Sequence, residues 1–259
     1  MTTETRHAPT GRLLRSQVRY HNYIFWRTPV SAFFTLIFPV LLFVIFALVF
    51  GNERIDALGI SVAQYFAPSI AVFAAASASY TNLAINTAYQ RDLGILKRVR
   101  GTPLPRWIYV AGKVVVAVLV GAIATGVLLA IGFVFYDLQI AVSRVPAMVV
   151  AFLVGSAAFS ALGMMVAAFT SSGESATAIA QATLLPLAFF SGNFFVSTDL
   201  PSWLARLADI FPLKHFNEAF MSPFDPATTG SGFEWLDLAI MAVWGIGGAI
   251  LTARYFRWE

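Results

Sequence analysis

Six long apolar runs constrain this sequence more than any other feature, because each is long enough to cross a membrane as a helix. A transmembrane helix needs roughly 20 consecutive apolar residues to span the hydrocarbon core. The first run is too long for the apolar core of a signal peptide, which has roughly 7 to 15 residues. The runs are Val30–Phe50, Ala63–Ile85, Val110–Phe135, Val145–Phe169, Ala176–Val196 and Leu236–Tyr255. We therefore predict an all-α polytopic membrane protein with six transmembrane helices.

The composition agrees with a chain that is mostly embedded in lipid. Only 12% of its residues are charged and 58% are hydrophobic, whereas soluble domains carry roughly 25% charged residues. Residues 29–259 are predicted to form one transmembrane domain, and residues 1–28 a cytoplasmic segment before it. The absence of cysteine excludes disulfides, thiolate metal sites and cysteine nucleophiles, and we predict no metal site.

Arginine and lysine are distributed unevenly between the two sides of the predicted spans. Cytoplasmic loops close to span ends are enriched in these residues. Most of them precede the first span, surround the connection between the second and third, or end the chain, namely Arg6, Arg12, Arg15, Arg19, Arg27, Arg91, Lys97, Arg98, Arg100, Arg106, Lys113, Arg254 and Arg257. The alternate connections hold most of the acids, among them Asp56, Asp137 and Asp225. We therefore expect cytoplasmic termini, an even number of spans in a bacterial plasma membrane, and these acids outside.

The N-terminal segment has the two faces of a helix that lies in the membrane surface. At about 100° per residue the arginines of Arg12–Trp26 share one face, whereas Leu14, Val18, His21 and Phe25 share the opposite face. Because the net charge of +4 is concentrated beside apolar spans, membrane lipids are the expected anionic partner, not nucleic acid. The alternative is a plain basic flank that only fixes topology.

The connection Asn86–Lys113 is the most informative polar stretch, and it reads NTAYQRDLGILKRVRGTPLPRWIYVAGK. We predict a short helix over Tyr89–Val99, with Leu93, Leu96 and Val99 forming an apolar ridge among basic residues. A short charged helix with such a ridge suits docking into a groove on a soluble partner. The alternative is a basic loop that merely satisfies the charge bias of cytoplasmic connections.

A second unusual segment, Ser191–Phe220, follows the fifth run on the predicted external side. Two apolar stripes of helical period run through it, and Pro212 separates them because proline breaks a helix interior. The stripes are Trp203, Leu204, Leu207 and Phe211, then Leu213, Phe216 and Phe220. We therefore expect two short helical pieces.

Both segments resemble those of ABC-2-type permeases. In that family a polar helix turn between spans two and three leads to G-x-L and then T-P-L, and a serine–glycine pair near the end of span five precedes re-entrant helices and a P-L motif. The matching residues are Arg91, Asp92, Gly94, Ile95, Leu96, Thr102, Pro103, Leu104, Gly112–Lys113, Ser191–Gly192 and Pro212–Leu213. The resemblance covers nearly the whole chain and is to the branch of drug and nodulation-factor exporters that resembles daunorubicin permeases.

The resemblance implies the permease subunit of an ATP-binding-cassette exporter. In that family the connection holds a coupling helix that contacts a separately encoded nucleotide-binding subunit, and two permease protomers form a homo- or heterodimer. Glu174, after the fourth span, either joins that contact or caps the fifth span through the helix dipole. The residues that the resemblance places in the contact are Tyr89, Gln90, Arg91, Asp92, Gly94, Leu96, Lys97 and Arg98, with Gln90 or Asp92 standing where the family usually has glutamate.

The chain lacks the phosphate-binding loop that an ATPase needs, since Gly112–Lys113 is followed by Val114 and not by serine or threonine. We therefore expect no enzyme activity and no cofactor in this chain, with ATP and Mg bound by the partner subunit. An intramembrane enzyme is the alternative from another class, with His215 and Glu218 as its acid–base pair. A secondary transporter would need ionisable residues in the middle of the spans, which this sequence lacks.

Aromatic and polar residues within the spans mark a candidate substrate path, namely Phe33, Phe34, Phe38, Asn82, Asn86, Phe189, Phe190 and Asn193. The asparagines are as readily explained by hydrogen bonds between helices. The aromatic residues are also common as packing or lipid-facing groups. We expect export of an amphipathic or hydrophobic substrate, such as a drug, lipid or glycolipid, with a polysaccharide or lipid-linked glycan as the second candidate.

Overall fold

The computed structural model describes residues 9–50, 53–55, 58–196, 201–256 and 258. Part of the predicted cytoplasmic segment 1–28 and the expected external residue Asp56 lie outside these ranges. In the described ranges the regular structure is helical except for two strands of two residues each, β1 (Arg54–Ile55) and β2 (Ile60–Ser61), which pair antiparallel. The predicted all-α class is therefore confirmed.

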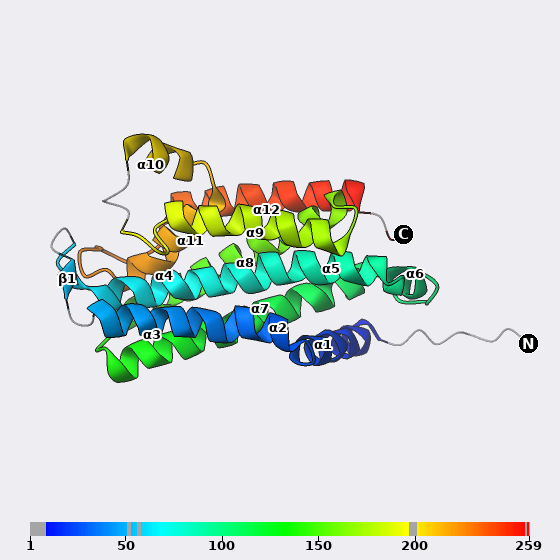
Figure 1. The fold of residues 1–259 in the computed structure, drawn as a ribbon, viewed down its shortest axis with the longest axis horizontal. Coiled ribbons are helices and arrows are strands. Elements are labelled where there is room, and N and C mark those ends of the chain that lie inside the picture. Colours follow the sequence, from blue (N-terminus) through cyan, green and yellow to red (C-terminus); the bar gives the residue numbers. More distant parts are fainter. Residues whose placement is uncertain (1–8, 51–52, 56–57, 197–200, 257, 259) are drawn as a thin grey trace, which may run out of the picture.

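The helices lie mostly along one axis of the molecule (Figure 1). Their bounds are α1 (Thr10–Trp26), α2 (Pro29–Ala32), η1 (Phe33–Ile37), α3 (Phe38–Phe50), α4 (Val62–Ala76), η2 (Ser77–Thr81), α5 (Asn82–Asp92), α6 (Ile95–Arg100), α7 (Arg106–Phe135), η3 (Val142–Arg144), α8 (Val145–Phe169), α9 (Gly173–Phe190), α10 (Ser202–Ala208), α11 (Pro212–Met221), η5 (Ser222–Phe224) and α12 (Trp235–Tyr255). In Figure 1, α1, α6 and the last turns of α12 lie at one end of the molecule, which we call the α6 end. The β1 strand and α10 lie at the opposite end, which we call the α10 end.

Five helical stretches are long and apolar enough to cross a membrane, and they confirm five of the predicted runs. They are Pro29–Phe50, Val62–Asp92, Arg106–Phe135, Val142–Phe169 and Trp235–Tyr255. The fifth predicted run corresponds to α9, which packs against α5 but carries Glu174 and Gln181 in its first half. The exact number of six spans therefore stays a prediction.

Two predicted details of the fifth run and the segment after it can be compared with the structure. The helix ends at Phe190 and not at Val196, because Gly192 turns the chain with a left-handed φ of +81°. The predicted break at Pro212 is confirmed, since α10 ends at Ala208 and Pro212 begins α11. The α11 helix packs inward, where Phe216 and Phe220 are fully buried.

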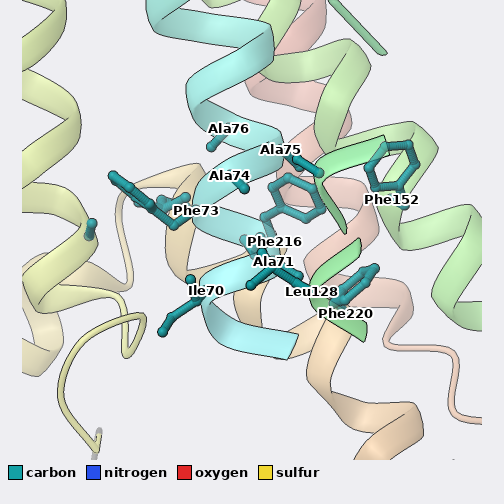
Figure 2. Close-up of a cluster of buried hydrophobic side chains, with 14 of the residues drawn as sticks. Ile70, Ala71, Phe73, Ala74, Ala75, Ala76, Leu128, Phe152, Phe216 and Phe220 are labelled. Carbon is teal, nitrogen blue, oxygen red and sulfur yellow. The ribbon is translucent and has the colours of Figure 1, made fainter. Parts of the chain in front are cut away.

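The core is built around α4, in which every residue from Val62 to Ala76 is buried. Figure 2 shows its small side chains, such as Ala71 and Ala75, next to bulky groups from α7, α8 and α11, such as Phe216. Small residues let helix backbones approach closely in lipid, where van der Waals packing is a main source of helix association. This explains why a helix with so many alanines lies at the centre.

The N-terminal helix α1 forms as predicted and lies along α7. Its arginines are exposed, whereas His21 and Phe25 are buried. A Cβ atom at Gly112 of α7 would lie only 2.7 Å from Cβ of Gln17, so glycine permits this close approach. The position of α1 in the membrane surface stays a prediction.

Gly163 of α8 provides a test of the packing around the centre. A Cβ atom there would lie 2.6 Å from the carbonyl oxygen of Tyr80, and backbone cannot move aside as a side chain can. We expect Gly163→Ala to lower the stability of the purified protein by about 1 to 3 kcal/mol, the usual cost of overpacking. Thermal unfolding in detergent measures this effect.

The control is Gly126→Ala on α7, where nothing lies within 4 Å of the added Cβ atom. Alanine is the better helix former, so this variant should be as stable as the parent protein or more so. Equal melting temperatures for the two variants would contradict the packing described here.

Candidate functional site

A cavity of about 580 Å³ lies between three walls, formed by α2 with η1, by α4 to α5, and by α9. Within the ranges that the structure describes, its lining carries no charged side chain. Part of it is polar, with Thr, Ser, Asn and Gln side chains, and the rest consists of Phe, Ile, Leu, Val and Tyr. The lining residues are Thr28, Val30, Ser31, Phe34, Thr35, Phe38, Phe73, Ser77, Thr81, Asn82, Ile85, Asn86, Tyr89, Thr177, Gln181 and Leu185. The cavity thus joins the first and second predicted spans to α9.

A second cavity of about 520 Å³ adjoins the first toward the α10 end and shares Phe38 and Leu185 with it. Every side chain in its lining is apolar, and the residues are Phe38, Leu42, Phe46, Phe50, Ile55, Val62, Phe66, Leu185, Phe189, Phe194, Phe195 and Val196. We call the two cavities together the groove. Among the described residues, no acidic, basic or histidine side chain lines it.

The groove brings together five of the eight predicted path residues, namely Phe34, Phe38, Asn82, Asn86 and Phe189. Asn86 donates a hydrogen bond from Nδ2 to Oδ1 of Asn82, so the two amides form one polar patch on α5. Phe33 lies outside both linings, with its ring against that of Phe34. Phe190 also lies outside them.

Asn193 was predicted on the path, but the structure places it in the core. It is fully buried, and its Nδ2 donates to the Ser69 carbonyl at 2.7 Å and to Oδ1 of Asn217 at 3.4 Å. Asn193 therefore ties the end of α9 to α4 and α11. The alternative interpretation as a hydrogen-bond link between helices is the one that its contacts support.

Two walls of the groove follow stripes with a four-residue spacing. One runs through Phe73, Ser77, Thr81, Ile85 and Tyr89, and the other through Thr177, Gln181, Leu185 and Phe189. In a regular α-helix this spacing advances by about 40° at each step, so a long stripe turns away from a straight wall. This spacing is a signal in the sequence that identifies groove residues missed by hydropathy alone.

Both π-helical segments in the described ranges contribute to the groove, because Phe34 and Thr35 lie on η1 and Ser77 and Thr81 on η2. The wider turns of η2 keep its long stripe on one face. Pro39 follows η1 and has no N–H to donate to the Thr35 carbonyl, and its ring also crowds that carbonyl, which explains the wider turns there. Such segments are frequent at functional sites.

The predicted helix over Tyr89–Val99 is wrong in its bounds. The long helix of the second span continues to Asp92, Gly94 turns the chain with φ of +67°, and α6 covers only Ile95–Arg100. This turn removes Leu96 from the predicted docking ridge. Its side chain is fully buried in a cluster with Tyr109 and Trp258, whereas Leu93 is 68% exposed.

Arg91 and Asp92 bind the turn between α8 and α9 within this chain. Arg91 donates to the carbonyl oxygens of Ala167 and Thr170 at 2.7 and 2.5 Å, and Asp92 accepts from the backbone N–H of Gly173 at 2.6 Å. A cation thus faces the C-terminal end of α8 and an anion the N-terminal end of α9, as the helix dipoles favour. These two side chains have a structural role that the family resemblance did not predict.

The other residues predicted for the coupling contact divide into buried and exposed. Gln90 is buried and accepts a hydrogen bond from the Tyr109 hydroxyl at 2.5 Å. The ring of Tyr89 packs over Gly173 and is 42% exposed. Lys97, Arg98 and Glu174 are exposed, and with Leu93 they form what we call the α6 surface. Ser172 provides the N-cap of α9 through a capping box, and Glu174 lies in the first turn, where the helix dipole favours an acid.

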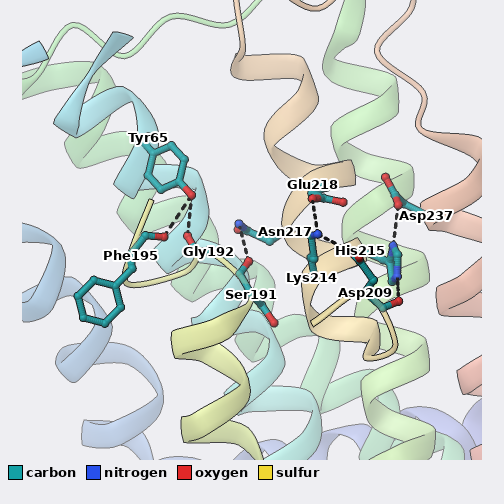
Figure 3. A network of polar contacts seen from close by, with 10 residues as sticks. All are labelled: Tyr65, Ser191, Gly192, Phe195, Asp209, Lys214, His215, Asn217, Glu218 and Asp237. Atoms are coloured by element: carbon teal, nitrogen blue, oxygen red, sulfur yellow. Dashed lines mark hydrogen bonds and ion pairs between the residues drawn. The ribbon is translucent and has the colours of Figure 1, made fainter. Parts of the chain in front are cut away.

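A polar network lies near the α10 end (Figure 3), where Lys214 pairs with Asp209 and with Glu218. Nδ1 of His215 lies 2.7 Å from the Asp237 carboxylate and Nε2 lies 2.9 Å from the Asp209 carbonyl oxygen. Each ring nitrogen of His215 thus lies within hydrogen-bond distance of an oxygen from another residue. Burial raises the pKa of Glu218 above its usual range.

This network decides how His215 and Glu218 can act. Ligand atoms of His215, Glu218 and Asp237 lie within 4.8 Å of one another, which is close enough for a metal ion. However, both ring nitrogens of His215 already have a hydrogen-bond partner within the chain, Asp237 and the Asp209 carbonyl. The contacts of His215 therefore favour a structural role over that of catalytic base or metal ligand.

Two curated permeases are similar in sequence to this chain. The chain is 28% identical over 193 residues to the daunorubicin resistance ABC transporter permease protein DrrB1 of Streptomyces coeruleorubidus, covering 72% of this chain and 66% of that protein. It is 25% identical over 134 residues to the probable multidrug ABC transporter permease YbhR of Escherichia coli K12, covering 52% of this chain and 36% of that protein. The chain thus spans just under two thirds of the first relative and about a third of the second.

The family model described as ABC-2 type transporter matches residues 13–224, which include every wall of the groove, the α6 surface and α11. The match covers well over half of the 259 residues. The predicted resemblance is therefore confirmed, and the chain belongs to the ABC-2 type transporter family.

Proposed function

We propose that this chain is the membrane-spanning permease subunit of a bacterial ATP-binding-cassette exporter that moves an amphipathic or hydrophobic molecule, such as a drug, lipid or glycolipid, out of the cell. The groove carries this proposal. One part of it offers uncharged hydrogen-bonding groups and the other only apolar side chains. A molecule with a polar head and an apolar body matches both parts, because its head meets hydrogen-bonding side chains and its body meets apolar ones. The names of the two relatives, a daunorubicin resistance permease and a probable multidrug permease, support the same class.

A polysaccharide or lipid-linked glycan is the second candidate substrate. A glycan chain needs hydrogen-bonding partners along its whole length, since unpaired hydroxyl groups are costly to bury. The part of the groove near the α10 end offers none from its side chains. The groove therefore favours a smaller amphipathic molecule.

A second permease protomer, identical or related, would cover the open side of the groove. The walls there carry large apolar side chains that are partly exposed, including Phe34, Ile37, Leu41 and Ile45 on η1 and α3 and Phe189 on α9. Within a membrane such a face contacts either lipid or another protein. Two protomers facing each other along this side would enclose a path between them.

The α6 surface is the proposed docking site for the ATPase subunit, which would bind ATP and Mg. Leu93 offers an exposed apolar contact, Lys97 and Arg98 offer positive charge, and Glu174 lies on the neighbouring first turn of α9. Because Arg91 and Asp92 fasten that turn to α5, a force on α6 acts on two walls of the groove at once. This chain would thus supply the path and its movement, and the partner the hydrolysis.

The first prediction for this function concerns orientation. If the α6 end is cytoplasmic, cysteine introduced at Arg98 should react with a membrane-impermeant maleimide only after the cells are opened, whereas cysteine at Asp137 or Asp225 should react in intact cells. The chain has no native cysteine, so each signal reports one site. Labelling of position 98 from outside would reject this orientation.

The second prediction concerns the ATPase contact. Leu93→Asp should weaken binding of the ATPase subunit by about tenfold and lower its stimulation by the permease, because a carboxylate replaces an apolar anchor. Co-purification and ATP hydrolysis by the reconstituted complex measure both effects. Val142→Asp is the matched control, since Val142 is 84% exposed at the opposite end of the molecule. Normal binding by the Leu93 variant would remove the α6 surface from the contact.

The third prediction concerns the groove. Gln181→Trp adds bulk to its α9 wall, and we expect a several-fold slower ATP-dependent uptake of amphipathic dyes by inside-out vesicles. Assembly with the partner subunits should persist, because Gln181 is exposed toward the groove and not packed in the core. Val243→Trp on α12, at a 69% exposed position outside the groove lining, is the control. Equal transport by the two variants would contradict a path through the groove.

A further inference from the structure

A lysine is buried inside the bundle, and no acidic side chain in the described part of the chain pairs with it. Lys113 lies on α7 and is only 4% exposed. Its Nζ donates to the Thr87 hydroxyl at 2.9 Å and lies 5.1 Å from the centre of the Tyr109 ring. The ion pairs found among the described residues do not include it. An amine with two further N–H groups is thus held where charge is costly unless it has a partner.

Lys113 borders a small cavity of about 40 Å³ between α1, α5 and α7. Its polar lining consists of Lys113, His21, Gln90, Asn82 and Asn86. A buried water needs roughly 10 to 15 Å³, so there is room for a water or for the terminal oxygens of a polar group. We call this cavity the Lys113 site.

His21 supplies a second unsatisfied group at the same place. The residue is 6% exposed, and its Nε2 has no hydrogen-bond partner among the described residues. Burial, together with the nearby charge of Lys113, lowers the pKa of His21 to about 3, so its ring is neutral at physiological pH. The ring hydrogen-bonds to the Tyr109 backbone through its other nitrogen, which leaves Nε2 as an acceptor.

The Lys113 site adjoins the groove, because Asn82 and Asn86 line both. These are the amides that form the polar patch on α5. A molecule whose head lies against this patch therefore adjoins the cavity that Lys113 borders. The opposite part of the groove, around Phe46 and Phe66, is apolar and suits a hydrocarbon body.

The two unsatisfied groups select among polar heads by charge and by hydrogen bonding. Lys113 has donors to offer and repels a cation, whereas Nε2 of His21 needs a donor. A carboxylate accepts but has nothing to donate. A monoprotonated phosphate does both, since its charged oxygen accepts from the ammonium group and its P–OH donates to the imidazole.

We propose that the Lys113 site receives the phosphate monoester head of an amphipathic molecule that lies in the groove, so that the permease favours anionic amphipaths over cationic ones. This proposal rests on the proposed function, because it takes the groove as the substrate site. A membrane phospholipid whose head is itself a phosphate monoester, such as phosphatidate, could offer the same chemistry from the side of α1, and the experiment separates these two sources.

The experiment compares two probes with the same tail, dodecyl phosphate and dodecyltrimethylammonium, by titration of the purified permease in lipid nanodiscs. The parent protein should bind dodecyl phosphate about tenfold more tightly, because a charge-assisted hydrogen bond is gained by one probe and repulsion by the other. Lys113→Met keeps the length of the side chain and should abolish the preference. Arg254→Met removes an exposed cation at the end of α12, outside the α6 surface and the cavity linings, and should keep the preference.

Equal binding of the two probes by the parent protein overturns the proposal even if the Lys113 variant does not fold. An unchanged preference in folded Lys113→Met overturns it as well. Gln181→Trp distinguishes the sources, since it should weaken dodecyl phosphate binding if the head arrives through the groove. Binding that depends on Lys113 but not on Gln181 would assign the site to a membrane phospholipid and overturn the groove-bound form. A further outcome separates this proposal from the proposed function. If Gln181→Trp leaves dye transport unchanged while Gln181→Trp and Lys113→Met both weaken dodecyl phosphate binding, the proposed export path is wrong and the Lys113 site stands.

Discussion

The close packing of small side chains around α4 is the interaction on which the rest of the structure depends. No residue of this helix reaches the surface, and α3, α7, α8 and α11 all contact it. Lipid offers no hydrophobic reason for helices to associate, so the fit of backbone against backbone has to provide it. The groove then lies on one side of the continuation of α4 through η2 and α5, and the Lys113 site lies on another. One central helix thus gives both cavities a common wall.

The α5 helix connects the groove and the Lys113 site to the turn between α8 and α9 and to α6. Its first residues, Asn82 and Asn86, line the groove and the Lys113 site, and its last turn holds the α8–α9 turn through Arg91 and Asp92. Immediately after it, Gly94 turns the chain into α6. Because a helix is stiff along its axis, we expect a displacement of α6 to reach the groove through α5. The proposed docking surface and the groove are thereby connected through one continuous element.

Much of this architecture could be predicted from the sequence, because the hydropathy of a span, the two faces of α1 and the break at Pro212 are local properties. The errors arose where distant contacts or backbone turns decide. The left-handed conformation of Gly94 buries Leu96 and exposes Leu93, and periodicity alone assumes a straight helix. Asn193 was predicted on the path because the sequence does not show its hydrogen-bond partners. These partners, Ser69 and Asn217, come from other elements. A motif that marks a contact in a family likewise did not reveal that Arg91 and Asp92 bind within the chain.

The three walls of the groove are not held equally. Two of them, α4 to α5 and α9, are joined at both ends, by Arg91 and Asp92 near α6 and by Asn193 and Tyr65 near α10. In the described part of α2, η1 and α3, no side-chain hydrogen bond reaches another helix, so apolar contacts alone hold this wall. Apolar contacts are not directional, and a helix held by them can slide or tilt while its neighbours keep their bonds. One adjustable wall that faces two fixed ones would let the same groove admit molecules of different widths. The range of molecules admitted would then depend on the movement of this wall and not on a variety of binding groups.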